Sequence, residues 1–130
     1  MAPVTQARLF LRLDLGERVR LGPGKIRLLE EIARLGSISG AGRAMKMSYR
    51  RAWLLVDDLN SSFREPVVTT RLGGEGGGKA SLTPAGRAVV RAYRAIENES
   101  RRILAKRSSA LLKQLRGAAR RPKRRRSRSR

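Results

Sequence analysis

The chain has 130 residues, with neither cysteine nor histidine, and its 31 Lys and Arg against 10 Asp and Glu give a formal net charge of +21. This length is typical of one domain. The missing residue types exclude a disulfide scaffold, a zinc knuckle, a thiol nucleophile and a histidine general base. So large a positive charge predicts a polyanionic partner, with nucleic acid as the first candidate and an anionic membrane surface as the second.

The sequence shows no sign of a membrane segment. Its longest aliphatic or aromatic run covers positions 52–56, far short of the roughly 20 residues that a membrane-spanning helix needs. The N-terminus lacks the basic and apolar regions of a secretory signal. We therefore expect a cytoplasmic protein that does not bind membranes.

Alternation of polar and apolar residues over 8–15 predicts a half-buried strand, followed by a Gly-Pro loop over 16–24. From Lys25 apolar residues recur every three or four positions, which predicts an amphipathic helix with Gly36 as its C-cap. Glu30 lies four residues before Arg34, the favourable order for an ion pair on this helix.

A short second helix and a third helix are expected next. Ser37 caps the second helix, from Ile38 to about Met45, and Ser48 caps the third, from Tyr49 to about Ser61. Lys46 and Met47 form the tight turn between them. Gly40 and Gly42 inside the second helix cost roughly 1 kcal/mol each relative to Ala, which predicts close approach of either the neighbouring helix or a DNA backbone.

A hairpin and a long helix complete the predicted elements. Strands over 67–72 and 80–82 flank a glycine-rich tip, and Thr83 caps a helix with Pro84 at its first position. This helix carries apolar spacing to Leu115, and its polar centre, 97–102, predicts that it either breaks there or leaves the domain. The apolar stripe beyond that point predicts a second copy as its partner, or else folding back onto the chain's own body.

The last fourteen residues, 117–130, contain eight basic residues and no acid, so residues 1–116 still carry +13. A tail without large apolar side chains is expected to be disordered when free. It either solubilises the chain or binds polyphosphate. The cations expected to bind are Arg120, Arg121, Lys123, Arg124, Arg125 and Arg126.

No pattern in the sequence predicts an enzyme. The adjacent carboxylates 30–31 and 57–58 point about 100° apart on a helix. The glycine segment 73–79 resembles a P-loop, but position 80 is Ala instead of the Ser or Thr that holds magnesium. We expect a non-enzymatic protein without a metal or cofactor.

The order of elements predicts a mainly α fold with a small β-hairpin. It is that of a winged helix-turn-helix domain with an N-terminal strand and a long C-terminal dimerisation helix, covering residues 1–116 ahead of the basic tail. A capped third helix fits the major groove, which is about 12 Å wide. The hairpin would then reach the flanking backbone.

Several motifs together resemble the N-terminal DNA-binding domain of ModE, the molybdate-responsive regulator family, and more loosely that of LysR-type regulators. They are GSISG at 36–40, SYRRAW at 48–53, DLN at 58–60, GGEGGGK at 73–79 and LTPAG at 82–86. The resemblance implies a homodimer on a palindromic operator upstream of molybdate-transport genes. It matches the recognition helix to 48–60 and the wing to 71–82.

The resemblance has one large departure. The full-length regulators carry C-terminal molybdate-binding domains, and here an arginine-rich tail stands in their place. We therefore expect that this chain does not sense molybdate by itself. Either a separate effector-sensing protein supplies metal control, or the DNA-binding domain serves another set of genes.

The candidate DNA contacts centre on the third helix. Arg50 and Arg51 in its first turn are expected to read guanine or to bind phosphate. Tyr49 either contacts a sugar or phosphate or is half-buried, and Ser48 places a helix N-terminus near a phosphate. The further expected contacts, on the second helix, its turn and the wing, are Ser37, Ser39, Arg43, Lys46, Arg71 and Lys79. The core is expected to hold Met45, Met47 and Trp53.

The sequence thus predicts a sequence-specific, nucleoid-associated DNA-binding transcriptional regulator. Two alternatives stay open. One is an architectural nucleoid protein or RNA-binding protein in which the basic tail dominates. The other is a module that docks onto a partner sensor.

Overall fold

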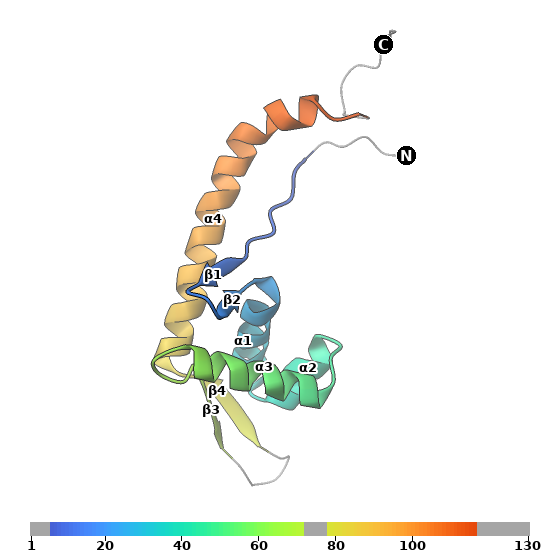
Figure 1. The fold of residues 1–130 in the computed structure, drawn as a ribbon. Coiled ribbons are helices and arrows are strands. Elements are labelled where there is room, and N and C mark those ends of the chain that lie inside the picture. The colour runs from blue at the N-terminus through green and yellow to red at the C-terminus, as the bar shows by residue number, and fades with distance from the viewer. Residues whose placement is uncertain (1–5, 72–77, 117–130) are drawn as a thin grey trace. The chain divides into compact units, whose positions relative to one another are not determined.

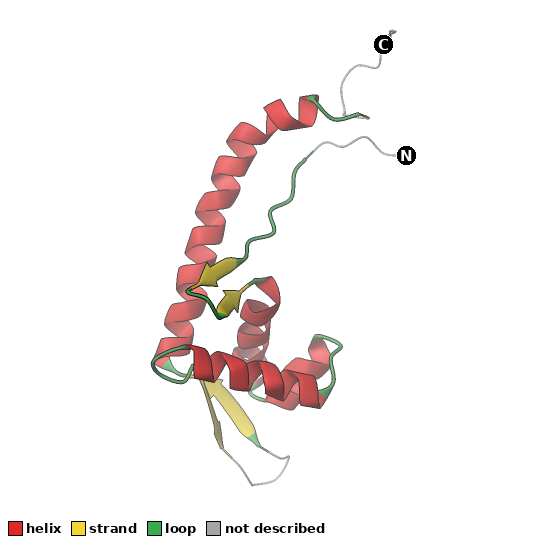
Figure 2. Ribbon diagram, in the orientation of Figure 1, coloured by secondary structure: helices red, strands yellow, loops and turns green. Residues whose placement is uncertain are grey.

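The structure is a computed structural model that describes residues 6–71 and 78–116. The chain divides into a larger unit, Phe10–Ile96, and a smaller one made of Met1–Leu9 and Glu97–Arg130. The elements (Figures 1 and 2) are β1 (Leu13–Leu15), β2 (Val19–Leu21), α1 (Pro23–Leu35), α2 (Ile38–Ala44), α3 (Tyr49–Ser62), β3 (Val68–Arg71), β4 (Lys79–Leu82) and α4 (Pro84–Lys113). This order confirms the predicted fold class.

The N-terminal strand is shorter than predicted, and the predicted loop after it contains a second strand. β1 and β2 pair antiparallel with Asp14 opposite Arg20. Because β2 has only three residues, the alternating residues before Leu13 have no ladder partner there. A hydrogen bond from the Arg12 guanidinium lowers the pKa of the Asp14 carboxyl, but the pair is exposed and contributes little to stability.

Helix α1 supplies the centre of the core in the larger unit. It begins at Pro23, two residues earlier than predicted, and ends at Gly36, whose φ of 72° is left-handed. The amide of Gly36 donates to the carbonyl of Ile32 at 2.8 Å, which closes the last turn. The buried apolar residues are Leu21, Ile26, Leu28, Leu29, Ile32, Ile38, Ala41, Ala52, Val56, Leu59, Val67, Val68, Ala80, Leu82 and Tyr93.

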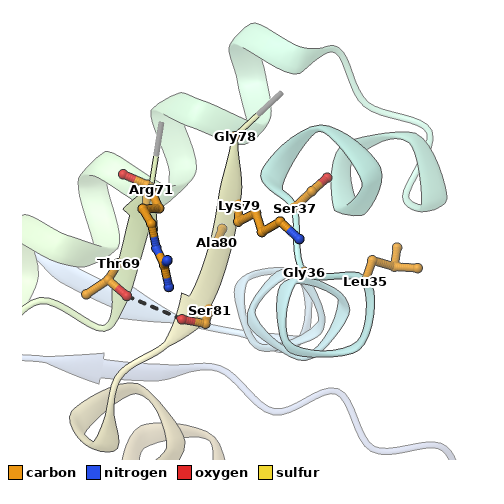
Figure 3. Close-up of a pocket in the computed structure, with 10 residues that line it drawn as sticks. Leu35, Gly36, Ser37, Thr69, Arg71, Gly78, Lys79, Ala80 and Ser81 are labelled. Carbon is orange, nitrogen blue, oxygen red and sulfur yellow. Dashed lines mark hydrogen bonds between the residues drawn. The ribbon is translucent and has the colours of Figure 1, made fainter. Parts of the chain in front are cut away.

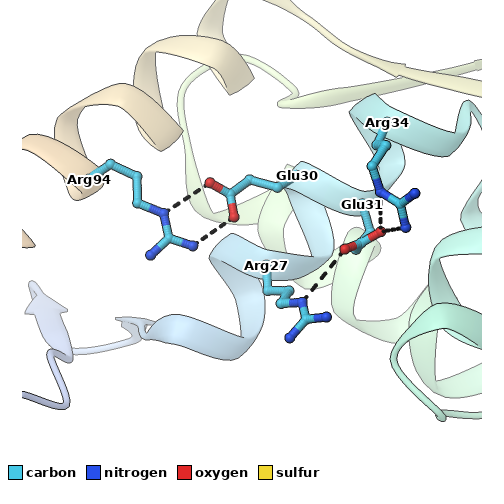
Figure 4. A network of polar contacts seen from close by, with 5 residues as sticks. All are labelled: Arg27, Glu30, Glu31, Arg34 and Arg94. Carbon is cyan, nitrogen blue, oxygen red and sulfur yellow. Dashed lines mark hydrogen bonds and ion pairs between the residues drawn. The ribbon is translucent and has the colours of Figure 1, made fainter. Parts of the chain in front are cut away.

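Two polar contacts connect this core to the first part of α4. The hydroxyl of the buried Tyr93 donates to the carbonyl of Leu11 at 2.6 Å. Figure 4 shows the Arg94 guanidinium donating to both carboxylate oxygens of Glu30, at 2.9 and 2.6 Å. The predicted pair between Glu30 and Arg34 is therefore wrong, and Arg34 donates to Glu31 instead.

Asn60 near the end of α3 holds the start of strand β3, which leads into the wing. Its side-chain oxygen accepts from the amides of Val67 and Val68 at 2.8 and 3.0 Å, and its amide group donates to the carbonyl of Val68 at 3.1 Å. One half-buried side chain thus forms hydrogen bonds with three backbone groups. These bonds fix the start of β3 against the end of α3.

We expect Asn60→Ala to lower the free energy of unfolding by about 2 kcal/mol, because a buried polar group left without a partner costs about 1–3 kcal/mol. Urea denaturation followed by circular dichroism measures this. The matched variant Asn60→Asp keeps the acceptor for both amides, so its loss should be smaller. Equal stability of Asn60→Ala and the native chain would contradict this role.

Helix α4 is a single helix through the polar segment 97–102, so the alternative of a break there is wrong. Its start is fixed by Thr83, whose hydroxyl accepts from the amide of Gly86 at 2.9 Å and donates to the carbonyl of Pro66 at 2.7 Å. In the smaller unit, Ile103 and Leu111 are 61% and 69% exposed. Leu104, Ser108 and Leu112 of the same helical segment line a cavity of about 660 Å³ together with residues 6–9.

Candidate nucleic-acid interface

The α2–turn–α3 segment has the local chemistry that a helix-turn-helix needs. The hydroxyl of Ser37 accepts from the amide of Gly40 at 2.7 Å, and that of Ser48 accepts from the amide of Arg51 at 3.1 Å. Both predicted caps are therefore confirmed. Lys46 adopts a left-handed φ of 58° in the turn, and the amide of Met47 donates to the carbonyl of Gly42 at 2.9 Å.

Close packing against α3 explains why position 42, inside α2, is a glycine. A Cβ atom at this position would lie 3.2 Å from the Cβ of Ala52 on α3, tighter than ordinary van der Waals contact. The neighbouring helix, rather than DNA, thus accounts for Gly42. The close approach fixes α3 against α2 and so sets where the first turn of α3 lies.

The first turn of α3 presents its cationic side chains to solvent. Arg50 and Arg51 are exposed, and within residues 6–71 and 78–116 neither guanidinium has a carboxylate partner. Tyr49 is 58% exposed, which decides against the half-buried alternative. Further along α3, the Asp58 carboxylate forms an ion pair with Lys25 on α1 at 2.7 Å rather than with a cation of the first turn.

Two further residues predicted to contact DNA, Ser39 and Arg43, lie on α2. Arg43 donates to the hydroxyl of Ser39 at 2.8 Å, so these two side chains support one another one helical turn apart. Lys46 is exposed at the turn. Met45 and Met47 are partly buried against the core, as predicted.

The wing is held against the end of α1. The amide of Ala80 on β4 donates to the carbonyl of Gly36 at 2.9 Å, and β3 pairs with β4 so that Arg71 lies opposite Lys79. The predicted wing cations are thereby brought beside the predicted Ser37. Residues 72–77, between the two strands, lie outside the described residues.

A hollow of about 710 Å³, here called the wing hollow, lies between the hairpin and the junction of α1 with α2. Figure 3 shows Lys79 and Arg71 along the two strands, with a hydrogen bond of 3.3 Å between the hydroxyls of Thr69 and Ser81. Hydroxyls and cations of this kind suit the oxygens of a phosphate backbone. The lining residues are Leu35, Gly36, Ser37, Thr69, Thr70, Arg71, Gly78, Lys79, Ala80 and Ser81.

Trp53 is predicted to lie in the core together with Met45 and Met47. It does pack against the core, but it is only partly buried. Its ring meets that of Tyr49 edge-on, with 6.2 Å between centroids and 76° between planes. The contact between Tyr49 and Trp53 could have been predicted from the sequence, because residues four apart on a helix lie on the same side.

The tail cations Arg120, Arg121, Lys123, Arg124, Arg125 and Arg126 lie outside the described residues. Over the described ranges, no group of three acidic side chains is placed to hold a metal ion. In that same part of the chain, no helix is both long and apolar enough to cross a bilayer.

Residues 24–87, which contain α2, the turn and α3, match the family profile of the bacterial regulatory helix-turn-helix protein, lysR family. This part of the chain is a LysR-type helix-turn-helix domain. The full-length LTTR LysG from Corynebacterium glutamicum, solved with bound effector Arg, has a similar fold. The TM-score is 0.52 at 24% identity, covering 72% of this chain and 30% of that one.

More similar sequences are ModE and Mop proteins, which confirms the ModE resemblance. The chain is 43% identical over 93 residues to the molybdenum transport protein ModE of Azotobacter vinelandii, covering 72% of this chain and 34% of that protein. It is 45% identical over 78 residues to the molybdenum-pterin-binding protein MopA of Rhodobacter capsulatus, covering 60% and 29%.

The DNA-binding transcriptional dual regulator ModE of Escherichia coli K12 is 35% identical over 88 residues, covering 68% of this chain and 34% of that protein. The chain thus spans about a third of the length of these relatives. Their names are those of a regulator, a transport protein and a binding protein rather than of enzymes, in agreement with the prediction of a non-enzymatic protein.

Proposed function

We propose that this chain is a sequence-specific transcriptional regulator that binds double-stranded DNA with α3 in the major groove. One observation carries the proposal: the capped first turn of α3 presents Arg50 and Arg51 to solvent without carboxylate partners among the described residues. An Arg guanidinium can donate two hydrogen bonds to guanine, the commonest base-specific contact. The cations and hydroxyls around the wing hollow would bind the flanking phosphates.

Two of the relatives are named for molybdenum, one for its transport and one for binding molybdenum-pterin, which supports a target among genes of molybdenum transport or use. Ser37, Ser39, Arg43 and Lys46 would then contact the backbone beside α2, and the tail cations would contact it elsewhere. A separate effector-sensing protein would supply metal control. The regulator would work at the nucleoid.

The experiment that tests this function is selection of the full chain on random duplex DNA at near-physiological salt. We expect one enriched motif with two inverted half-sites about one helical turn apart. Recovery of DNA without any enriched motif would contradict sequence-specific binding.

We further propose that the chain acts as a homodimer through the second half of α4. The exposed Ile103 and Leu111 support this, because apolar side chains on a helical surface favour a partner, and a two-fold dimer matches an inverted repeat. The double variant Ile103→Glu with Leu111→Glu should sediment as a monomer in analytical ultracentrifugation. Lys106→Glu, an exposed position on the same segment, is the control and should remain dimeric.

The charge of the tail favours a second candidate function, an architectural or RNA-binding protein. Deleting residues 117–130 should weaken binding to all duplexes and flatten the dependence of log K on log salt by up to about 0.9 for each phosphate that the tail neutralises. Fluorescence anisotropy at several salt concentrations measures both. An unchanged slope would remove the tail from the interface, whereas loss of all binding would favour the architectural function.

A further inference from the structure

A second hollow, here called the aromatic hollow, lies where α2, the start of α3 and the wing meet. Its volume is about 100 Å³. The buried side chains of Ile38 and Ala80 and the partly buried Trp53 contribute its apolar walls. Tyr49, Arg71 and Lys79 also line it, and all three are exposed.

This chemistry differs from that of the wing hollow, although the two share the wing residues Arg71 and Lys79. Both hollows have hydroxyls, from Thr69, Thr70 and Ser81 in the wing hollow and from Ser39 and Thr70 in the aromatic hollow. The aromatic hollow differs in its two rings, which meet edge-on. An accessible apolar recess beside two exposed cations is suited to a ligand that carries a small apolar group next to negative charge.

A thymine in duplex DNA is such a ligand. Its 5-methyl group is the apolar group that base edges present in the major groove, and side chains read it through apolar contact. Phosphates flank it on the same strand. The hollow is large enough for the group, since a water molecule, which is close to a methyl group in size, takes up about 30 Å³ in the liquid.

We propose that the aromatic hollow receives the 5-methyl group of one thymine in each half-site, with Tyr49 and Trp53 in contact with it. The inference rests on the proposed function and deepens it, because it assigns base discrimination to an aromatic pair in addition to the arginines. Arg71 and Lys79 bind phosphates next to that thymine. Tyr49 thereby becomes a specificity-determining residue.

The test replaces thymine by deoxyuridine, which lacks only the 5-methyl group, at each thymine of the selected operator in turn. Binding of the full chain is measured by fluorescence anisotropy. One thymine per half-site should show weaker binding on replacement, by about fourfold, the value expected for burying one such carbon group. Tyr49→Ala should bind the thymine and deoxyuridine operators equally.

Two further variants show whether a lost deoxyuridine penalty reflects loss of the aromatic contact or loss of the fold. Trp53→Phe retains an aromatic ring against the core and should reduce the deoxyuridine penalty without abolishing it. Leu54→Ala removes a 56% exposed side chain from the same helix and should retain the full penalty. Circular dichroism confirms that each variant is folded.

The outcomes separate this inference from the proposed function. If the operator is bound specifically but no deoxyuridine replacement weakens binding, the inference is wrong and the proposed function stands. The same holds if Tyr49→Ala keeps the full penalty. If no operator can be selected at all, both are wrong.

Discussion

At least one of Arg50→Ala and Arg51→Ala should weaken operator binding by about 1–3 kcal/mol, or roughly fivefold to 150-fold, and relax the sequence preference at one base-pair position. Both side chains are exposed in the first turn of α3. The Ser48 hydroxyl caps that turn by accepting from the amide of Arg51. The backbone of Arg50 and Arg51 is therefore already ordered in the absence of DNA. The measurement is anisotropy against operators with single base-pair changes.

Two matched variants distinguish base reading from charge. Lys79→Ala on the wing should weaken binding to all duplexes by a similar factor and lower the salt slope by about 1, as expected for a phosphate contact. Arg91→Ala removes the same charge from an exposed position on α4 and should have little effect. If Arg50→Ala and Arg51→Ala weaken every duplex equally, base reading by these residues is wrong.

Gly86→Ala should lower the free energy of unfolding by about 3 kcal/mol or more, the upper range for overpacking in a core. A Cβ atom at Gly86 would lie 2.1 Å from the carbonyl oxygen of Val67. The helix cannot easily move away, because the amide of Thr83 donates to that same oxygen at 3.0 Å. The hydroxyl of Thr83 also bonds both the carbonyl of Pro66 and the amide of Gly86.

Thermal unfolding followed by circular dichroism should show a fall in Tm of about 10 °C or more for Gly86→Ala. Gly24→Ala on α1 is the matched control, because a Cβ atom there would meet nothing within 4 Å. Ala is favoured over Gly inside a helix by roughly 0.5–1 kcal/mol, so this variant should be as stable as the native chain or slightly more stable. Equal Tm values for both variants would contradict the close packing at Gly86.

The starts of α2, α3 and α4 could be predicted from the sequence because side-chain capping is local chemistry, whereas α1, which has no side-chain cap, begins two residues before the predicted Lys25. Ser37, Ser48 and Thr83 each accept from an amide three residues later, at 2.7, 3.1 and 2.9 Å. Strand β2 could not be predicted in this way. Its three residues are too short for an alternation pattern, and it exists only through pairing with β1.

Side-chain partners far apart in the chain were also beyond sequence reasoning. Glu30 pairs with Arg94, 64 residues later, rather than with the predicted Arg34, because the packing of α4 brings that guanidinium to α1. For the candidate interface, the cations could be predicted individually. That Arg71 and Lys79 share one hollow with Ser37 depends on the bond between the Ala80 amide and the Gly36 carbonyl.

The central claim is that the helix-turn-helix distinguishes DNA sequences rather than binding any polyanion. The direct measurement compares the affinity of the full chain for the selected operator and for a scrambled duplex of equal length, at ~150 mM salt. We predict a ratio of at least about 10³, the lower end for specific DNA-binding proteins, with two chains bound per operator. Nearly equal affinities for the two duplexes would contradict the account.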